Sequence, residues 1–298
     1  MKFAIIPNMK KENIIVIVKK IIDEIIKNGF DFILSDRLTD FKSKLKIDDK
    51  KFEFLSHNLL VKNCDYIISI GGDGTMLQTA YEARNTNAPL IGINFGKLGF
   101  LAEFDVHNIS KLFKNLKQGT FVIEKRMTLE GVCLTERNRK LFAINDIVIE
   151  KGKYPKMIQM SVSVNDDYVT EFSADGVIIA TPTGSTGYAL STGGPVIQPT
   201  SDVISLNPIS PHTLNMRPLV LSDNQKITIE ILSAYENVQI SCDGQRVDYF
   251  KSPAKIEIYK GKKILKLVKT KSTNYFNTLR NKLHWGIDIR NENNKEKR

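Results

Sequence analysis

The chain has 298 residues, of which 42% are hydrophobic and 26% are charged, a composition typical of folded soluble proteins and long enough for two ordinary domains. Lysine and arginine number 43 against 33 acidic residues, which gives a formal net charge of +10. This charge favours phosphorylated or other anionic partners, but the lysines are spread along the chain and form no stripe, so we expect no nucleic-acid partner.

The sequence also disfavours a membrane span and a protein-built metal site. No run approaches the roughly 20 apolar residues that cross a bilayer, and the N-terminus lacks the order of a signal peptide. Cys64, Cys133 and Cys242 lie far apart, and the four histidines are equally scattered. We therefore expect a cytoplasmic protein with no membrane partner and with no metal held mainly by protein ligands.

The first third of the chain alternates strands with helices. Residues 13–28 carry isoleucine and valine at helical spacing, and Gly29 ends this helix. A second helix is expected from a cap at Thr75 to about Arg84. The expected strands are Lys2–Pro7, 30–34, 65–70 and 90–95. Such alternation predicts a Rossmann-like α/β domain with a mostly parallel sheet, which binds ligands at the carboxyl ends of its strands.

After a helix at 108–117 the pattern changes to short runs separated by turns. The expected strands are 121–130, 140–150, 157–164, Gly176–Ala180, 226–232, 237–241 and 254–258. They indicate an all-β, sandwich-like domain, so the fold class is α+β with two domains. We place the boundary between Glu103 and Asn108. The expected domains are 1–105, 106–274 and a C-terminal segment, 275–298, that packs back on the first domain.

Two glycine loops follow expected strands, Gly71-Gly72-Asp73-Gly74-Thr75 and Gly96-Lys97-Leu98-Gly99. The first precedes a helix N-terminus, whose N–H groups and dipole suit phosphate. A carboxylate there repels phosphate, but flanking glycines leave it unobstructed to orient or deprotonate an attacking hydroxyl. The spacing alone leaves a tight turn capped by Asp73 equally open. Neither a Walker loop nor the Rossmann Gly-x-Gly-x-x-Gly is present, which disfavours a simple dehydrogenase.

The densest feature is the segment 175–195, in which an apolar strand leads into a loop rich in threonine, serine and glycine. Small donors and acceptors of this kind suit the edges of a base or a ribose. The loop is not a hydrolase elbow, because Thr183 stands where Gly-x-Ser-x-Gly requires glycine. A Ser/Thr-rich surface loop remains the alternative.

Together the two loops resemble the NAD kinase family, the ATP- or polyphosphate-dependent NAD kinases. Further matching segments are Asn145-Asp146, Pro211-His212-Thr213-Leu214, Arg217-Pro218-Leu219 and Asp243-Gly244-Gln245. The resemblance spans most of the chain from Asp65 to Trp285. The first loop is shared with diacylglycerol kinases, whereas the Thr-Pro-Thr-Gly-Ser-Thr loop with its Gly-Gly-Pro continuation is specific to this family.

The resemblance implies transfer of a phosphoryl group to the 2′-hydroxyl of the adenosine ribose of NAD, which gives NADP. It assigns Asp73 as the proton acceptor, with Gly74 beside it against the dinucleotide. The implied dinucleotide-binding residues are Asn145, Asp146, Lys156, Asp175, Thr186, Gly187, Tyr188, Ala189, Leu190, Ser191 and Gln245. It also implies a homodimer or homotetramer in which a neighbouring subunit completes the site.

The chain departs from the family pattern at two positions. Asp146 stands where glutamate is frequent, and Gly187 stands where alanine is usual, so Gly187 is expected to contact ligand only through its backbone. Two predicted binding residues have non-functional alternatives: Asp146 can be simply an acid at a strand end, and Lys156 can be simply a solvated surface lysine. His212 is expected to be a structural histidine rather than a catalytic base.

The substrates implied are NAD and ATP, with Mg²⁺ or another divalent ion carried on the donor phosphates, since Mg²⁺ takes few protein ligands. The sequence leaves open whether ATP, another nucleotide or polyphosphate is the donor, whether NAD or NADH is preferred, and whether NADP inhibits. Two rival functions are a lipid kinase, which gives no reason for the second loop, and a non-enzymatic nucleotide-binding regulator.

Overall fold

The computed structural model describes residues 1–45, 52–94, 99–153, 155–232, 237–271 and 274–285. The chain forms two compact units. The first comprises Met1–Met76, Ala88–Ile123 and the chain from Val268 onward, and the second comprises Leu77–Asn87 and Glu124–Leu267.

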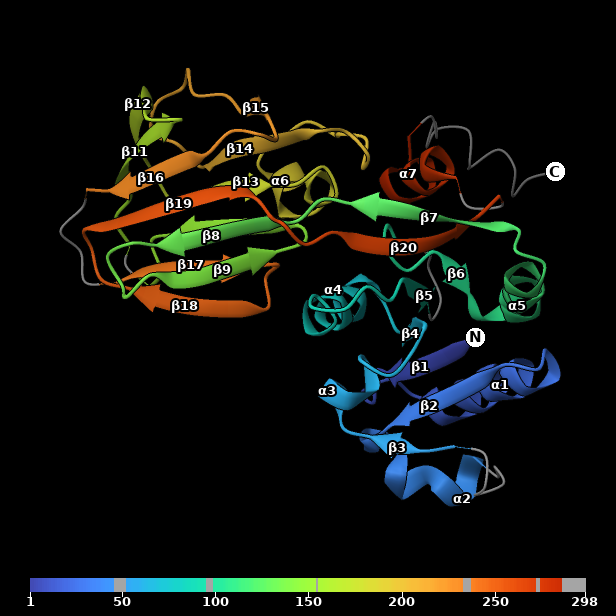
Figure 1. Cartoon of the computed structure of the whole chain (residues 1–298). Coiled ribbons are helices and arrows are strands. Elements are labelled where there is room, and N and C mark those ends of the chain that lie inside the picture. The colour runs from blue at the N-terminus through green and yellow to red at the C-terminus, as the bar shows by residue number, and fades with distance from the viewer. Residues whose placement is uncertain (46–51, 95–98, 154, 233–236, 272–273, 286–298) are drawn as a thin grey trace, which may run out of the picture. The chain divides into compact units, whose positions relative to one another are not determined.

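The first unit is built on an eight-stranded sheet in the order β3-β2-β1-β4-β5-β20-β7, with β6 paired to β5 (Figure 1). Neighbours among β1 to β6 run parallel. The strands are β1 (Lys2–Pro7), β2 (Asp31–Ser35), β3 (Phe54–Leu55), β4 (Tyr66–Ile70), β5 (Leu90–Asn94), β6 (Phe104–Asp105), β7 (Phe121–Arg126) and β20 (Leu265–Thr270). The helices are α1 (Ile14–Lys27), α2 (Lys42–Leu45), α3 (His57–Leu60), α5 (Ile109–Lys117) and α7 (Tyr275–Leu283), with 3₁₀ turns at Asp36–Phe41 and Val106–Asn108. Helix α4 (Asp73–Glu82) begins in this unit, and its residues from Leu77 onward belong to the second unit.

Helices α1 and α5 supply much of the first core. The apolar residues of α1 recur every three or four positions and are buried, as expected of an amphipathic helix: Ile14, Val18, Ile21, Ile22 and Ile25. On α5, Leu112, Phe113 and Leu116 join the same cluster, and so does Val268 of β20. This shared core explains why α5 and the chain after Val268 belong to the first unit.

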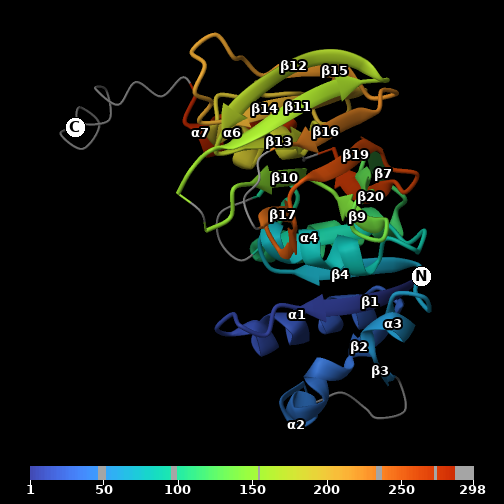
Figure 2. The same ribbon diagram turned by 90° about the vertical axis from the view of Figure 1, so that its left-hand side faces the viewer.

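The second unit is a sandwich of two six-stranded antiparallel sheets, seen from another side in Figure 2. Sheet C has the order β15-β14-β13-β10-β17-β18, and sheet B has the order β12-β11-β16-β19-β8-β9. The strands are β8 (Leu129–Cys133), β9 (Arg139–Ala143), β10 (Asp146–Glu150), β11 (Ile158–Val164), β12 (Asp167–Ala174), β13 (Gly176–Ala180), β14 (Val203–Ile209), β15 (Leu219–Ser222), β16 (Ile227–Ile231), β17 (Val238–Cys242), β18 (Arg246–Phe250) and β19 (Ala254–Lys260). A 3₁₀ turn at Gly184–Thr186 and the short helix α6 (Tyr188–Ser191) follow β13.

The two faces of sheet C have different roles. Inward residues such as Ile147, Ile149 and Val177 join the sandwich core. On the outer face, Val148 and Ile178 belong to a smaller cluster that includes Ala189 of α6. Because side chains alternate along a strand, Asp146 and Glu150 share the outer face of β10 with Val148. The outer face of sheet C therefore carries both α6 and the polar ends of β10.

The expected fold class is confirmed, since one unit contains a mostly parallel sheet with helices and the other is an antiparallel sandwich. Two expected strands were wrong. The run 121–130 is β7 and β8, separated where the Thr128 carbonyl accepts the Gly261 N–H. The run 140–150 is β9 and β10, separated where the N–H groups of Ile144 and Asn145 bind the Asp243 carboxylate.

The strands β3, β6, β12, β14, β15, β18 and β20 were not expected. The first unit extends to Ile123, beyond the expected boundary between Glu103 and Asn108, because α5 is part of its core. Helix α4 begins at Asp73, two residues before the expected cap at Thr75. Of the second glycine loop, Gly96, Lys97 and Leu98 lie outside the described residues.

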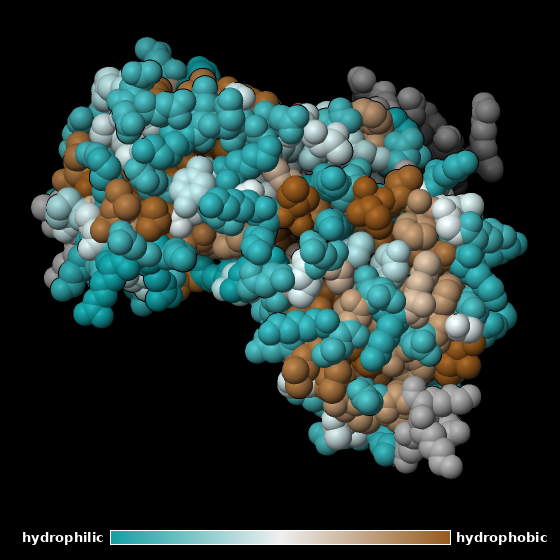
Figure 3. Space-filling view, in the orientation of Figure 1, coloured by the Kyte–Doolittle hydropathy of each residue, from teal (hydrophilic) through white to brown (hydrophobic). Residues whose placement is uncertain are grey.

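Hydrophilic side chains cover most of the face drawn in Figure 3, and hydrophobic ones form small groups between them. Among the described residues, no helix has the length and apolar character needed to cross a membrane.

Candidate functional site

Asp73 is the first residue of α4, and its carboxylate is occupied rather than unobstructed. Oδ2 accepts the backbone N–H of Phe100 at 2.9 Å, and Oδ1 accepts those of Leu101 and Ala102, each at 3.0 Å. A Cβ added at Gly99 would lie 1.9 Å from Oδ1, so only glycine allows the loop to close on the carboxylate. The expectation that the flanking glycines leave the Asp73 carboxylate unobstructed was therefore wrong. Oδ2 accepts only one of these N–H groups, so it can still accept a hydrogen bond from a hydroxyl.

The glycines before Asp73 are also fixed by close contacts. A Cβ at Gly71 would lie 2.7 Å from Thr75 Cβ, so this position requires glycine. The Gly71 N–H donates to the Ile93 carbonyl, and the Thr75 and Met76 N–H groups donate to the Gly72 carbonyl. Gly71 is therefore not among the N–H donors available to a phosphate. Gly74 is exposed in the first turn of α4.

A pocket of about 360 Å³ lies on the outer face of sheet C. Val148 pairs with Ser241 of β17, and Glu150 pairs with Gln239, so the floor of the pocket carries one apolar and three polar side chains. The remaining lining residues are Asn145, Asp146, Tyr188, Asp243, Gly244 and Val247. The pocket thus brings together Asn145, Asp146 and Tyr188, three of the residues predicted to bind a dinucleotide.

Asn145 offers the pocket an unused acceptor. Its Oδ1 is buried and has no hydrogen-bond partner within the described part of the chain. Buried polar atoms are paired in nearly all native structures, so an unpaired one at a pocket wall suits a donor on a ligand. An exocyclic amine or a ribose hydroxyl supplies such a donor.

Asp146 is buried at the start of β10 beside a second carboxylate. Burial and, after it, the negative charge of Asp243 together raise the pKa of Asp146 to about 7. No hydrogen bond to the Asp146 carboxylate is found in the described residues. Its charge state therefore changes near neutral pH, unlike that of an ordinary strand-end acid.

We expect Asp146→Asn to stabilise the protein at pH 8 but not at pH 4. In the unfolded chain Asp146 ionises near pH 4, whereas in the fold it ionises near pH 7. The folded protein therefore loses stability from this group as pH rises from 4 to 7, by about 4 kcal/mol in total. Melting temperatures of both proteins across this range test the expectation. Asp248→Asn, which removes an exposed ion pair with Arg139, is the control. A rise in the melting temperature of Asp146→Asn that is the same at every pH contradicts the expectation.

The hydroxyl groups of the 175–195 segment mostly hold the loop together. Thr181 Oγ1 donates to the Ile144 carbonyl at 2.7 Å, and Ser185 Oγ donates to the Pro182 carbonyl at 2.7 Å. Thr186 and Ser191 likewise donate to carbonyls within the loop. These hydroxyls shape the loop, and each oxygen can still accept a hydrogen bond.

Of the other predicted dinucleotide-binding residues, Tyr188 alone is among the residues that line this pocket. Tyr188 donates to Glu150 Oε1 at 3.1 Å, and Ala189 packs on sheet C, while Leu190 is half-buried. Asp175 pairs with Lys151 at 2.7 Å. The structure does not bring Lys156, Asp175 or Gln245 into the pocket lining.

Gly187 leaves room where the family usually has alanine. An added Cβ would lie 3.7 Å from both Asn145 Nδ2 and Asp146 Oδ2, and 3.1 Å from the Gly184 carbonyl oxygen. The glycine therefore leaves open the space next to Asn145 and Asp146 that a methyl group would fill. His212 is exposed, and its backbone N–H donates to the Ser173 carbonyl at 2.9 Å.

Sequence reasoning missed two functional candidates in this unit. Asp243 is fully buried and accepts backbone N–H groups from the chain entering β10. Arg246 pairs with it at 2.6 Å. A clue was available in Asp243-Gly244, a dipeptide typical of hairpin turns, but a turn aspartate gives no sign that its side chain is buried.

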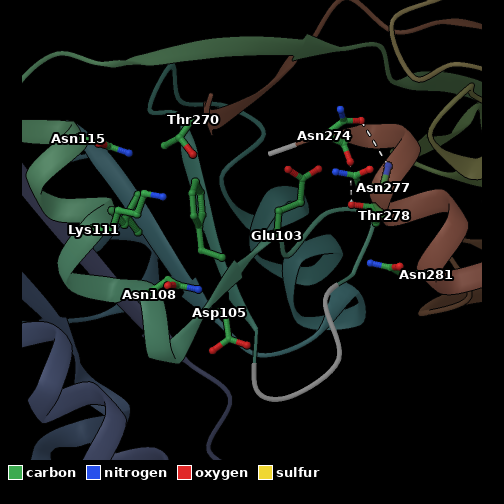
Figure 4. Close-up of a pocket in the computed structure, with 12 residues that line it drawn as sticks. Glu103, Asp105, Asn108, Lys111, Asn115, Thr270, Asn274, Asn277, Thr278 and Asn281 are labelled. Carbon is green, nitrogen blue, oxygen red and sulfur yellow. Dashed lines mark hydrogen bonds between the residues drawn. The ribbon is translucent and has the colours of Figure 1, made fainter. Parts of the chain in front are cut away.

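A second pocket, of about 310 Å³, lies within the first unit between β6, α5 and α7. Figure 4 shows Lys111 and Asn115 of α5 on one side and Asn277 and Asn281 of α7 on the other. Glu103, which lines this pocket, forms a buried ion pair with Lys269. None of the predicted site residues lines it. Across the described residues, no group of three or more His, Cys, Asp or Glu side chains is placed to hold a metal.

Comparisons with known proteins agree on one family. Residues 3–121 match the ATP-NAD kinase N-terminal domain, and residues 144–270 match the ATP-NAD kinase C-terminal domain. An NAD kinase of Chloroherpeton thalassium is 38% identical over 288 residues, which covers 96% of this chain and 98% of the relative. An NAD kinase of Clostridium botulinum is 39% identical over 269 residues, covering 90% and 93%.

Two solved structures share the fold. The yeast NADH kinase complexed with NADH superposes with a TM-score of 0.88 at 22% identity, covering 97% of this chain and 89% of that one. An NAD kinase from Archaeoglobus fulgidus in complex with ATP gives a TM-score of 0.74 at 26% identity, covering 95% and 99%.

Proposed function

The chain belongs to the ATP-NAD kinase family, phosphotransferases that convert NAD to NADP, and from this premise we propose how its residues divide that task. NAD binds in the pocket on the outer face of sheet C, and Asp73 accepts the proton of the 2′-hydroxyl of its adenosine ribose. ATP is the phosphoryl donor.

The observation that carries the assignment is the pocket around Asn145 and Asp146. Asn145 Oδ1 is a buried acceptor without a partner in the described residues, and Asp146 lies next to it on the pocket wall. An adenosine supplies the matching donors through its amine and ribose hydroxyls. Tyr188 and Glu150 extend the polar surface along β10.

Phosphoryl transfer depends on positioning and on charge neutralisation more than on covalent work by the protein. The free Oδ2 acceptor position of Asp73 can orient the ribose hydroxyl and take its proton, while Phe100, Leu101 and Ala102 hold the carboxylate in place. Mg²⁺ bound to the donor phosphates would supply the positive charge, since Mg²⁺ in such sites is held mainly by substrate phosphates and water.

Incubation with NAD, Mg²⁺ and ATP tests the proposal. We expect a product that an NADP-specific dehydrogenase reduces, because that enzyme reports a phosphate on the 2′ position. Polyphosphate in place of ATP identifies the donor, and diacylglycerol in micelles is the alternative acceptor. Turnover of diacylglycerol without turnover of NAD contradicts the proposal.

A cytoplasmic location and a homodimer or homotetramer also belong to the proposal. Strand β18 is at the edge of sheet C and exposes Val247 and Tyr249, and exposed strand edges favour pairing with another chain. Light scattering at micromolar concentration measures the association state, and a fully active monomer contradicts it.

A further inference from the structure

The turn between β17 and β18 carries a buried carboxylate that holds the start of β10. Asp243 Oδ1 accepts the N–H of Asn145 at 2.6 Å and of Ile144 at 2.9 Å, and that of Asp146 more weakly at 3.4 Å. The Asp243 N–H in turn donates to the Asp146 carbonyl at 2.9 Å. These contacts fix the backbone of two pocket residues through a side chain that comes from a distant turn.

Arg246 holds the other oxygen of this carboxylate. Its Nη2 donates to Asp243 Oδ2 at 2.6 Å and to the Phe142 carbonyl at 3.1 Å. The Asp243 side chain has no exposed surface and that of Arg246 is 21% exposed, so the pair is largely shielded from water. A charge-assisted bond on Oδ2 stops the carboxylate from rotating and keeps Oδ1 aimed at the N–H groups.

The guanidinium of Arg246 is itself held by an aromatic ring. Its central carbon lies 3.9 Å from the centroid of the Tyr81 ring, and that of Arg84 lies 4.0 Å from the same centroid. Two guanidinium groups at this distance must lie on opposite faces of the ring. Arg84 also donates to the backbone carbonyl of Tyr81 at 2.7 Å, and in the part of the chain that the structure describes it makes no hydrogen bond or ion pair with Asp243.

Stability alone gives no reason for an arginine at position 246. Its Nη1 is buried and has no hydrogen-bond partner within the described residues, and an unpaired buried donor costs stability. The ring also carries two like charges. These costs are better explained if the hydrogen bond from Arg246 to Asp243 Oδ2 is needed to hold the Asp243 carboxylate in place.

We propose that Arg246 is a positioning residue for dinucleotide binding, which aims the Asp243 carboxylate at the backbone of Asn145 and Asp146 and so holds both residues in the pocket. The inference rests on the proposed function, because it takes the pocket to be the NAD site. It adds a residue that touches no substrate.

The same contact affects the charge of the pocket. Asp243 contributes to the raised pKa of Asp146, after burial, and the positive charge of Arg246 offsets Asp243. The titratable and charged groups around Asp146 are Asp243, Glu150, Tyr188, Cys242 and Arg246. Loss of the Arg246 charge leaves the repulsion from Asp243 less compensated. The pKa of Asp146 then rises further, and the pH at which NAD affinity changes moves upward.

The experiment compares Arg246→Gln with Arg84→Gln. Both variants remove one guanidinium from the Tyr81 ring, but only the first loses the contact with Asp243. The KM for NAD, kcat and the melting temperature are measured from pH 5.5 to 8.5. We expect Arg246→Gln to raise KM at least about tenfold, with kcat changed less, and to shift the midpoint of KM against pH upward. Arg84→Gln is expected to leave KM and this midpoint as in the wild type.

Arg246→Lys completes the comparison, since it keeps the charge but cannot bridge Asp243 and Phe142 while stacking on Tyr81. We expect it to restore the pH midpoint and only part of the affinity. If Arg246→Gln does not fold, a wild-type KM in Arg246→Lys overturns the proposal. Equal KM values in both glutamine variants, or an unmoved midpoint in Arg246→Gln, also overturn it. A wild-type protein that does not turn over NAD refutes the proposed function instead.

Discussion

Replacing Asp73 by asparagine is expected to lower turnover of NAD by about 10²–10⁴-fold, the usual cost of removing a general base. Asparagine keeps the size of the side chain but cannot accept the proton of the ribose hydroxyl. NAD affinity is expected to change far less, because the binding residues Asn145 and Asp146 lie in the pocket on sheet C. Turnover and NAD affinity are measured on the same sample.

The structure adds a cost in stability to this substitution. One carboxylate oxygen becomes an NH₂ group, so a donor faces either the Phe100 N–H or those of Leu101 and Ala102, which costs about 1–3 kcal/mol. A lower melting temperature therefore does not by itself argue against catalysis. Asp105→Asn is the matched control, because Asp105 also accepts a backbone N–H, that of His107, at 2.6 Å. Activity of folded Asp73→Asn within a few-fold of wild type removes Asp73 from the catalytic role.

Asp243→Asn is expected to give the largest loss of stability, about 3 kcal/mol. Oδ1 can still accept the N–H groups of Ile144 and Asn145, but the new NH₂ group faces the Nη2 donor of Arg246. A buried pair that loses one charge leaves the other uncompensated, and the partial exposure of Arg246 limits the cost to the lower end of the usual range. The shift of the urea midpoint measures the loss.

The double variant Asp243→Asn with Arg246→Gln isolates the pair. We expect the two single losses to exceed the loss in the double variant, since the second substitution removes a charge that the first has already left unpaired. The pKa of Asp146 is expected to fall in Asp243→Asn, because the second cause of its rise is gone. Additive losses in the double variant argue that the two side chains act independently.

The first unit was predictable because its signals are local. The isoleucines of α1 recur at helical spacing, and the strands β1, β4 and β5 are short, mostly apolar runs. Buried parallel strands read this way because both of their faces are covered. The ends of these elements were harder to predict. Helix α4 begins at Asp73, whose side chain is held by the loop of residues 99–102, and no local pattern in the sequence indicates this contact.

The strands that were missed owe their structure to distant partners. Strand β14 contains Asn207 and Pro208, which read as a loop, but it pairs with β13 on one side and β15 on the other. Strand β18 alternates exposed and half-buried residues at the edge of sheet C. In such segments tertiary pairing overrides the local preference of the sequence.

The sequence predicted the residues that line the candidate site, but not the residues that hold them in position. The motifs indicated Asn145, Asp146 and Tyr188, and the structure brings all three to one pocket. Arg246 and Asp243 acquire their roles from a pairing of β17 with β10 that no spacing in the sequence reveals. The engagement of the Asp73 carboxylate likewise depends on a loop 27 to 29 residues away.

The internal bonding of the loop from Thr181 to Thr192 bears on the entropy of binding. Its hydroxyls donate to carbonyls of the loop and of Ile144, and Ser185 also accepts the Ile197 N–H at 3.0 Å. A loop tied down in this way is already ordered before a ligand arrives. Association then does not have to freeze its backbone, a step that costs roughly 1–2 kcal/mol for each residue fixed. The loop is therefore preorganised, and more of the contact energy is retained as affinity.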